Sequence, residues 1–419
     1  MSKTIIFITN SFPYQGGEQF IETEILFYKD LSDRIILVPL TNNGNMREIP
    51  SNIEIRTFLA EQLKIRKSNF LKKVFFVLST LKVKDFYKEI LLNPRVLLSL
   101  TLLKALVSTL AHAYFIFEKL KNLLLKENLL NKDLVIYSYW FNHPAYAGGL
   151  IKRNFPFVRV ITRAHRGDLY KYVTPLNHLK LKYFYGRNLD GIYSISEEGR
   201  RHLIENYGFR EDKVFVSRLG ILRHDYLSDF NKEDNLLHII SCSFLVPVKR
   251  LDKLIEILYE YGKRYPEKKV KWSHIGDGPL RSSLEEMAGS ILGSLRNVSY
   301  NFIGHLSNSE VYKFYRDNKI DLFINVSESE GVPVSIMEAM SFGIPVVAPK
   351  VGGIPEIVDN ETGILVEPNF IIDDIIEAIE KILLCFRSTE KRTKIKEKLY
   401  ERYDAEKNYR DFIENVLLK

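Results

Sequence analysis

The sequence is short of cysteine: only Cys242 and Cys385 occur among 419 residues, far apart and outside any metal-binding spacing. A disulfide-stabilised secreted domain is therefore excluded, and we expect two reduced thiols in a cytoplasmic protein. Met1–Phe7 holds one lysine and a very short apolar run, which predicts a first strand and not a signal peptide. The chain has no internal repeat or low-complexity tract, and its composition (46% hydrophobic, 27% charged) is typical of a globular protein.

Several catalytic motifs are also missing. No Asp-x-Asp pair is present to bridge a metal to a diphosphate, and we expect no metal or other cofactor. The P-loop, G-x-S-x-G, His-Glu-x-x-His and Cys-x-x-Cys motifs are absent. The full G-x-G-x-x-G fingerprint is absent too, which argues against an NAD-dependent oxidoreductase.

Positive charge, in contrast, is concentrated in one place. The net charge is +8, and residues 61–130 alone contain 13 Lys/Arg against 5 Asp/Glu. The same segment carries the most apolar run, Val96–Phe117, which is broken by Lys104 and His112. This run barely meets the requirements of a transmembrane helix. A buried helix of an α/β domain, flanked by basic amphipathic helices, is the better interpretation.

Two interpretations of the basic helices stay open. They rest on an anionic lipid surface, or they are a solvated basic face without a partner. Nucleic acid is not expected, because the interleaved aromatic and glycine pattern of a binding module is missing. The apolar lipid contacts in the first interpretation are Phe70, Phe75, Phe76 and Phe86.

Short β-branched runs alternate with helical patterns along the whole chain. Continuous apolar strands separated by helices predict parallel sheets covered on both faces. We expect an α/β protein with two doubly wound, Rossmann-like domains that face each other across a cleft. The predicted strands are Thr4–Asn10, Arg34–Pro39, Leu134–Ser138, Val158–Thr162, Gly191–Ser194, Val214–Arg218, His238–Phe244, Val270–Ile275, Val298–Phe302, Leu322–Asn325, Pro345–Ala348 and Gly363–Val366.

The polar stretch Arg223–Asn235 is the expected break between the halves. The chain is too long for one ordinary core, which favours two domains. The predicted division is residues 1–222, which include the segment 61–130, then residues 236–400, and a final helical segment 401–419. Ligands of such sheets bind outside the carboxyl ends of the strands, so a shared ligand is expected in the cleft.

The strongest motif is Glu-Gly-Val-Pro-Val-Ser-Ile-Met-Glu, from Glu330 to Glu338. It follows an apolar strand and opens a helix whose amino end is suited to a phosphate. Glu338 is the one charged side chain of residues 331–349, so it needs a partner. That partner is either the hydroxyls of a ribose or a nearby backbone amide. The residues expected to approach the ligand are Gly331, Val332, Pro333 and Val334.

Three weaker patterns accompany this motif. Lys249 and Arg250 precede a helical pattern, where cations oppose the helix dipole; they either hold an anion or point into water. Gly276-Asp277-Gly278 follows a strand and either lines a nucleotide pocket or is an ordinary turn. In the first half, Gly16-Gly17 and His165 follow strands and are expected at the ligand-binding edge of the sheet.

With these residues in order, the chain resembles the retaining glycosyltransferases of family four (glycosyl transferases group 1), which have the GT-B fold. The resemblance covers roughly Leu237–Pro368, and looser similarity extends to Gly16-Gly17, His165, Ser194–Glu197 and Arg218–Ile221. Similar proteins build bacterial surface polysaccharides such as O-antigen, capsule or exopolysaccharide. The matching segments are Leu245–Lys249, His274–Pro279, Glu330–Glu338, Gly343–Ala348, Gly352–Glu356 and Asn360–Gly363.

The resemblance implies roles for these residues. Glu338 would hold the ribose of a nucleotide sugar, and Glu330 the hydroxyls of the transferred sugar. Lys249 and Arg250 would neutralise the diphosphate. His165 would contact the sugar from the acceptor side, Gly16 and Gly17 would reach the donor phosphate, and Gly278 and residues 331–334 would line the donor pocket. Many relatives have Gly-Arg-Leu where this chain has Ser243-Phe244-Leu245, so Arg250 is the expected replacement for the missing arginine.

The implied function is transfer of a sugar, with retention, from a nucleotide-diphosphate sugar to a hydroxyl of a growing, lipid-linked glycan. Retention on one face requires no protein nucleophile. The implied location is the cytoplasm, at the inner face of the plasma membrane, and in relatives the final helix crosses back to the first domain. A nucleotide-sugar epimerase of the same fold and a non-catalytic partner of an active transferase are the alternatives. The intact Glu330, Glu338 and Lys249 argue against the second alternative.

Overall fold

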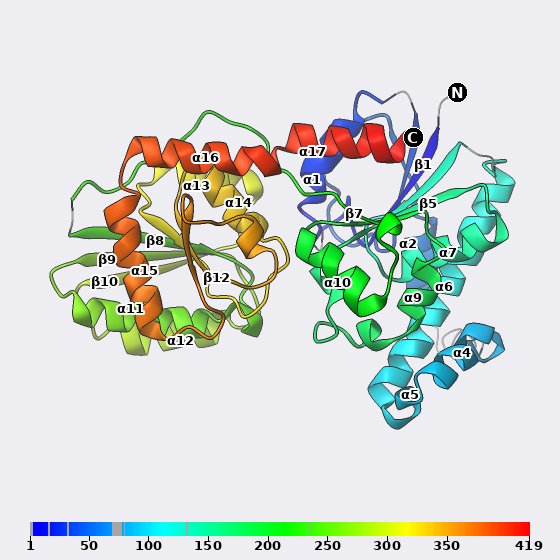
Figure 1. The fold of residues 1–419 in the computed structure, drawn as a ribbon, viewed down its shortest axis with the longest axis horizontal. Helices are drawn as coiled ribbons and strands as arrows, with labels where there is room; N and C mark the ends of the chain where they lie inside the picture. The colour runs from blue at the N-terminus through cyan, green and yellow to red at the C-terminus, as the bar shows by residue number, and fades with distance from the viewer. Residues whose placement is uncertain are drawn as a thin grey trace. The chain divides into compact units, whose positions relative to one another are not determined.

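The computed structural model describes residues 3–15, 17–31, 33–68, 78, 80–130, 133–233 and 235–419. Gly16, Phe70, Phe75 and Phe76, named above, lie outside the described residues. The chain divides into two compact units (Figure 1). Unit 1 is Met1–Gly220 together with Ala405–Lys419, and unit 2 is Ile221–Asp404. The polar stretch Arg223–Asn235 is therefore part of unit 2, and the division falls just before it.

Unit 1 is built on a parallel sheet with the order β3-β2-β1-β4-β5-β6-β7, which are its strands among the described residues. Strands β2 and β3 lie to one side of β1, and β4 to β7 lie to the other. The point where the order reverses is therefore between β1 and β4, and such a point is where doubly wound sheets bind ligands. The strands are β1 Thr4–Thr9, β2 Arg34–Pro39, β3 Ile53–Ile55, β4 Leu134–Ser138, β5 Arg159–Ala164, β6 Gly191–Ser194 and β7 Val214–Val216.

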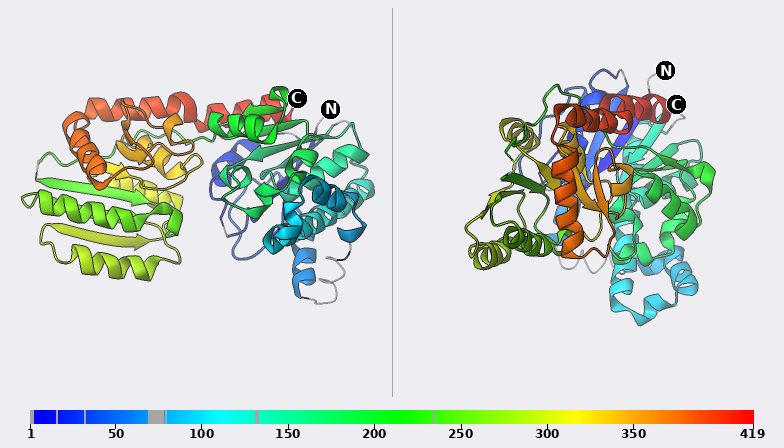
Figure 2. Two further views of the ribbon diagram at one scale, coloured as in Figure 1. Left: turned by 60° about the horizontal axis from the view of Figure 1, so that its bottom comes forward. Right: turned by 60° about the vertical axis from the view of Figure 1, so that its left-hand side comes forward.

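Alternate residues of β1 face opposite sides of this sheet, as the pleat of a strand requires. Ile6 and Ile8 pack in a core with helices α6, α7 and α9, whereas Ile5 and Phe7 pack with α1 and α17. Both faces are thus covered (Figure 2). The α-helices of unit 1 among the described residues include α1 Ile21–Ile25, α2 Phe58–Ser68, α4 Lys84–Leu92, α5 Arg95–Leu98, α6 Leu100–Lys126, α7 His143–Asn154, α8 Arg166–Leu169, α9 Leu181–Gly186, α10 Glu197–Tyr207 and α17 Ala405–Phe412.

Helix α17 returns from unit 2 and packs on α1, covering a buried ion pair in unit 1. Arg163 of β5 is fully buried and its Nη1 lies 3.1 Å from Glu24 Oε2 of α1. The ring of Phe412 stacks 4.5 Å from the Arg163 guanidinium. Tyr28 and Tyr137 each donate a hydrogen bond to Glu24 Oε1 at 3.2 Å. The pair is therefore enclosed by aromatic rings from both ends of the chain, which compensates part of its desolvation.

The apolar segment Val96–Phe117 forms two helices, the short α5 and the long α6. By length and hydropathy α6 is long and apolar enough to cross a membrane. Leu106, Leu110 and Ile116 of α6 are buried in the core of unit 1, and a core helix passes the same test. Phe86 of α4 is only 7% exposed, so its predicted role as a lipid contact is wrong: it faces the core.

Unit 2 contains a second parallel sheet, whose strands among the described residues have the order β10-β9-β8-β11-β12-β13. Its order reverses between β8 and β11. The strands are β8 Leu236–Cys242, β9 Lys269–Ile275, β10 Val298–Gly304, β11 Leu322–Ile324, β12 Val346–Pro349 and β13 Gly363–Val366. The helices are α11 Leu251–Arg264, α12 Arg281–Leu292, α13 Asn308–Asp317, α14 Val334–Ser341, α15 Ile372–Cys385 and α16 Thr389–Tyr403.

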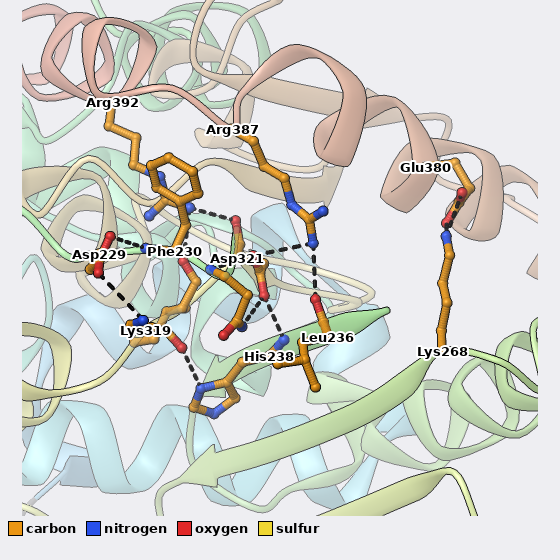
Figure 3. Close-up of polar contacts among 12 residues, drawn as sticks. Asp229, Phe230, Leu236, His238, Lys268, Lys319, Asp321, Glu380, Arg387 and Arg392 are labelled. Atoms are coloured by element: carbon orange, nitrogen blue, oxygen red, sulfur yellow. Dashed lines mark hydrogen bonds and ion pairs between the residues drawn. The ribbon is translucent and has the colours of Figure 1, made fainter. Parts of the chain in front are cut away.

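A buried charge network fastens the first residues of unit 2 to the amino ends of its central strands (Figure 3). The Asp321 carboxylate accepts hydrogen bonds from the His238 backbone N–H at 2.7 Å and from the Asn231 side chain at 2.6 Å. Arg387 Nη2 lies 3.5 Å from the same carboxylate. Arg392 of α16 is 1% exposed, and its guanidinium donates to the carbonyls of Ile320 and Asp321. Through Asn231, this network attaches the stretch that precedes β8 to the rest of unit 2.

The two doubly wound sheets predicted from the sequence are confirmed, and most strand ends agree within two residues. Strand β3 was not predicted. It is a three-residue edge strand, Ile53–Ile55, and Glu54 interrupts its apolar pattern.

Candidate functional site

Lys249 and Glu330 meet beyond the carboxyl ends of β8 and β11, the two strands at which the sheet order of unit 2 reverses. Lys249 ends the 3-10 turn Pro247–Lys249, and its Nζ donates to Glu330 Oε1 at 2.6 Å. Ser327 Oγ and Asn325 Nδ2 donate to the same oxygen at 2.7 and 3.2 Å. Glu330 is 6% exposed, so the sequence places a paired, buried carboxylate at the ligand-binding edge of the sheet.

Arg250 does not join this cluster. Its backbone is left-handed, with φ of 52°, at the residue that caps the amino end of α11. Its guanidinium Nη2 lies 3.3 Å from Asp252 Oδ2, and the side chain is 38% exposed. A nearby carboxylate thus offsets the unfavourable position of a cation at a helix start. The predicted replacement of the missing family arginine by Arg250 stays a prediction.

Glu338 lies on α14, one helical turn beyond the amino end of this helix, and is 8% exposed. Its carboxylate accepts a hydrogen bond from the Asn308 side chain at the start of α13. Burial raises the pKa of Glu338 to about 8, and the Asn308 hydrogen bond opposes that rise. The protein partner of this carboxylate is therefore a side-chain amide, and the group is largely protonated at neutral pH.

Glycines allow the turn after β9 to pack closely against the segment after β8 that leads to Lys249. Gly276 has a φ of 137°, and a Cβ added there would lie 1.9 Å from the Ser243 carbonyl oxygen. A Cβ on Gly278 would lie 2.6 Å from the Leu245 carbonyl oxygen. The Gly276–Gly278 turn therefore packs against residues 243–245, the segment between β8 and Lys249. Gly331 is held similarly, because its carbonyl accepts from the Gly353 N–H at 2.7 Å.

Pro333 caps the amino end of α14, and Val334 is the first residue of this helix. The first N–H groups of any helix have no partner within it, and they carry the positive end of the helix dipole. In α14 these groups begin with the N–H of Val334, because Pro333 has no N–H, and Val334 follows Glu330 by four residues.

In unit 1, the loop after β1 is organised by Glu18, a residue that the sequence did not single out. Glu18 is 5% exposed and has a φ of 60°, unusual for a residue with a side chain. Its carboxylate accepts from the backbone N–H groups of Ser11 and Phe12 at 2.7 and 2.6 Å, and from the Trp140 indole. The neighbouring Gly17 has a φ of 113°, which only glycine adopts readily.

His165 follows β5 and lies within a group of aromatic rings. Its ring centroid is 4.8 Å from that of Tyr139 and 4.7 Å from that of Trp140. Only 6% of its surface is exposed, and neither ring nitrogen has a hydrogen-bond partner in the described part of the chain. Burial lowers the pKa of His165, although Asp168 opposes this, so the imidazole is neutral at neutral pH.

Each unit also contains a cavity. In unit 1, a cavity of about 420 Å³ lies at the carboxyl ends of β1 and β2. In unit 2, a cavity of about 470 Å³ lies at the amino ends of β8, β9 and β10, beside the His238 and Lys319 of Figure 3. The unit 2 cavity lies at the edge of the sheet opposite to the edge that carries Lys249 and Glu330, so it is separate from the candidate site. The polar lining of the first is Asn10, Ser11, Thr41, Asn42, Asn43, Lys64, His112 and His143.

The partners of the two glutamates, Asn308, Asn325 and Ser327, were missed from the sequence. They stand in no motif that separates them from other polar loop residues. Among the predicted residues, the structure brings Lys249 and Glu330 into contact. Gly17 and His165 belong to unit 1, and the remaining candidates surround the carboxyl edge of the unit 2 sheet.

The fold defines the class. Solved structures similar over nearly the whole chain are GT-B proteins: apo WaaB, a lipopolysaccharide outer core galactosyltransferase, has a TM-score of 0.67 at 14% identity and covers 98% of this chain and 99% of its own. HepE from Anabaena in complex with UDP-glucose has a TM-score of 0.62 at 17% identity, with 99% of each chain covered. The two sheets of this protein therefore form a GT-B fold.

Residues 225–402, which lie within unit 2, match the family described as glycosyl transferases group 1. A phosphatidylinositol N-acetylglucosaminyltransferase component from Arabidopsis thaliana is 29% identical over 224 residues, which are 52% of this chain and 48% of that protein. The O-antigen biosynthesis glycosyltransferase WbnH from Escherichia coli is 28% identical over 195 residues, 46% of this chain and 50% of its own. The chain thus spans about half the length of these curated relatives.

Proposed function

We propose that this protein is a glycosyltransferase that moves a sugar, with retention, from a nucleotide-diphosphate sugar to a hydroxyl of a lipid-linked surface glycan. The contact between Lys249 and Glu330, at the point where the sheet order of a glycosyl transferases group 1 domain reverses, carries this proposal. The relatives that act on O-antigen, lipopolysaccharide and phosphatidylinositol support a lipid-linked acceptor. The proposed location is the cytoplasm, at the membrane where such acceptors reside.

Lys249 and Glu330 have distinct proposed roles. An ammonium group has three donors, and Glu330 takes one of them, so two protons of Lys249 stay available for the donor diphosphate. All the protein contacts of Glu330 that join described residues are made to Oε1. Its Oε2 then accepts hydrogen bonds from hydroxyls of the transferred sugar. The ion pair thus holds the carboxylate in place, while Lys249 can still donate to the diphosphate and Glu330 Oε2 can still accept from the sugar.

Breaking the sugar–phosphate bond places negative charge on the leaving diphosphate. Lys249 and the N–H groups at the start of α14 would stabilise that charge. The acceptor hydroxyl would attack on the face from which the diphosphate leaves, which preserves the anomeric configuration without a protein nucleophile. We propose that no metal takes part and that Arg250 assists Lys249.

The acceptor is proposed to bind in the cavity of unit 1. Its lining is rich in amide and hydroxyl groups, which suit sugar hydroxyls, and Lys64 is the one permanently charged side chain among its described lining residues. His143 contributes a neutral ring, because burial lowers its pKa to about 3. The ring of His112 lies 5.3 Å from that of His143 and closes the side of the cavity formed by α6.

The proposed function is tested first by screening nucleotide-diphosphate sugars for an increase in the melting temperature of the protein. UDP-sugars are the first choice, because HepE was solved with UDP-glucose. We expect one donor to stabilise the protein and to be transferred to lipid-linked glycan from bacterial membranes. A donor that is converted without any acceptor would instead identify an epimerase, and the absence of any nucleotide-sugar binding would refute the proposal.

Glu338 makes donor binding depend on pH. A ribose donates its hydroxyls to the ionised carboxylate, whereas the free protein holds Glu338 protonated below its raised pKa of about 8. Binding below that pH therefore requires loss of a proton. We expect the donor Kd to fall by about tenfold between pH 7 and pH 9, as measured by calorimetry, because each pH unit below the pKa reduces the ionised fraction about tenfold.

The control variant is Glu338→Gln, which keeps the shape of the side chain but has no proton to lose. We expect its Kd to be weaker and flat over the same pH range. If both proteins show the same pH dependence, the titrating group lies elsewhere and the ribose role of Glu338 is wrong. Heats measured in two buffers of different ionisation enthalpy report the proton release directly.

A further inference from the structure

A group of leucines is exposed on α4, α5 and the start of α6, at one end of unit 1. Leu91 and Leu98 are 82% and 89% exposed. Figure 1 shows these short helices projecting beyond the body of unit 1, and Figure 2 shows the same projection from a second side. We call this group the leucine tip: it consists of Leu91, Leu92, Leu97, Leu98 and Leu100, all of them at least half exposed.

Five exposed leucines within ten residues are unusual on a protein surface. Single exposed leucines are common, but several large apolar side chains gathered in one short segment mark a surface that binds something apolar. The same helices do have a core side, because Phe86 and Val96 are buried in unit 1. The helices are therefore firmly attached to the fold, and the leucine tip is their outward face.

The charged side chains around the leucine tip also differ in orientation: carboxylates face inward and most cations face solvent. The segment 80–110 has two carboxylates, and both face inward. Asp85 accepts hydrogen bonds from Tyr114 at 3.1 Å and Tyr146 at 2.5 Å. Glu89 is fully buried and accepts from the backbone N–H groups of Lys180 and Leu181 at 2.8 and 2.7 Å.

The cations of this segment, in contrast, mostly face solvent. Lys82, Lys84, Arg95 and Lys104 are exposed, and none of them has a carboxylate partner among the described residues. The outward surface of the segment 80–110 consequently combines large apolar side chains with cations and has no exposed carboxylate. This arrangement is complementary to a surface that is apolar inside and negative outside.

We propose that the leucine tip is a membrane-docking surface, in which the leucines enter the apolar boundary of a bilayer and the exposed cations of the segment 80–110 contact anionic lipid headgroups. Two copies of this chain paired through the leucine tip would bring like charges together, which disfavours self-association. The proposal agrees with a lipid-linked acceptor but does not depend on it, because docking requires no sugar transfer.

The test is flotation of the full-length protein with vesicles of phosphatidylcholine, with and without phosphatidylglycerol, at low and at high salt. We expect binding to the anionic vesicles, at least about tenfold weaker binding to phosphatidylcholine alone, and further weakening by salt. Leu91→Gln/Leu98→Gln should reduce binding to anionic vesicles by about tenfold or more, because two apolar side chains no longer enter the bilayer. Lys84→Gln/Arg95→Gln should reduce the dependence on phosphatidylglycerol and on salt.

A matched control is available in unit 2, where Leu384 and Ile371 are 84% and 62% exposed. Leu384→Gln/Ile371→Gln removes two comparably exposed apolar side chains away from the leucine tip, and we expect vesicle binding to be unchanged. All these variants should keep the melting temperature of the parent, since no buried side chain changes. Equal binding by the parent and Leu91→Gln/Leu98→Gln would overturn the proposal. If the protein instead does not bind vesicles and forms a dimer that Leu91→Gln/Leu98→Gln dissociates, the leucine tip is a self-association surface and the membrane proposal is wrong.

Discussion

Replacing Lys249 by methionine should lower kcat/KM by about a hundredfold to a thousandfold, the usual effect of removing one group that stabilises charge on the reacting atoms. Methionine keeps most of the unbranched side chain, which is one atom shorter, but removes the charge and all three donors. The leaving diphosphate then loses the cation that the Lys249–Glu330 contact holds in place. The change is measured as the rate of transfer from the donor identified by thermal shift.

Loss of Lys249 also leaves a 6%-exposed Glu330 carboxylate without its cation, so misfolding must be separated from loss of chemistry. Lys249→Met/Glu330→Gln removes both charges and should regain the melting temperature lost by the single variant, without regaining activity. Lys271→Met is the matched control, because Lys271 lies at the amino end of β9, on the opposite edge of the sheet. An active Lys249→Met protein, within about threefold of the parent, would show that Lys249 does not stabilise the leaving group.

The second large effect is on stability. Asp321→Ala should destabilise unit 2 by about 3–5 kcal/mol, the range for breaking a buried charge network by removing one partner. Asp321 is 1% exposed, and loss of its carboxylate leaves the His238 N–H and the Asn231 side chain without this acceptor (Figure 3). Arg387 loses the negative charge 3.5 Å from its Nη2, although it still donates to the Leu236 carbonyl. Asp321→Asn keeps one acceptor oxygen and should cost less.

The two tryptophans of the chain allow this effect to be assigned to one unit. Trp272 is fully buried in unit 2, whereas Trp140 lies in unit 1. Denaturant unfolding in a Trp140→Phe background, followed by fluorescence, therefore reports unit 2. A midpoint that does not move in Asp321→Ala would mean that the network adds no net stability.

The parallel sheets could be predicted from the sequence because most strands are largely apolar runs with a helix after them, whereas β3, which Glu54 interrupts, could not. Lys249 and Glu330 could also be predicted, since motifs mark both and the sheet topology brings them to one edge. Asn308 could not be predicted as the partner of Glu338, because the two residues are joined only by the packing of α13 beside α14. The lipid contact assigned to Phe86 failed for a related reason: its neighbours Leu91 and Leu98 are equally apolar, and only the packed structure shows which side chains face out.

The return of α17 to unit 1 has a consequence for biosynthesis. Phe412, Ile413 and Leu417 are buried in the core on one face of the unit 1 sheet, yet they are synthesised only after the whole of unit 2. Unit 2 is complete earlier, although most of unit 1 is synthesised first. The first 220 residues must therefore wait with part of their apolar face uncovered, and this is the interval in which a nascent chain depends most on chaperones.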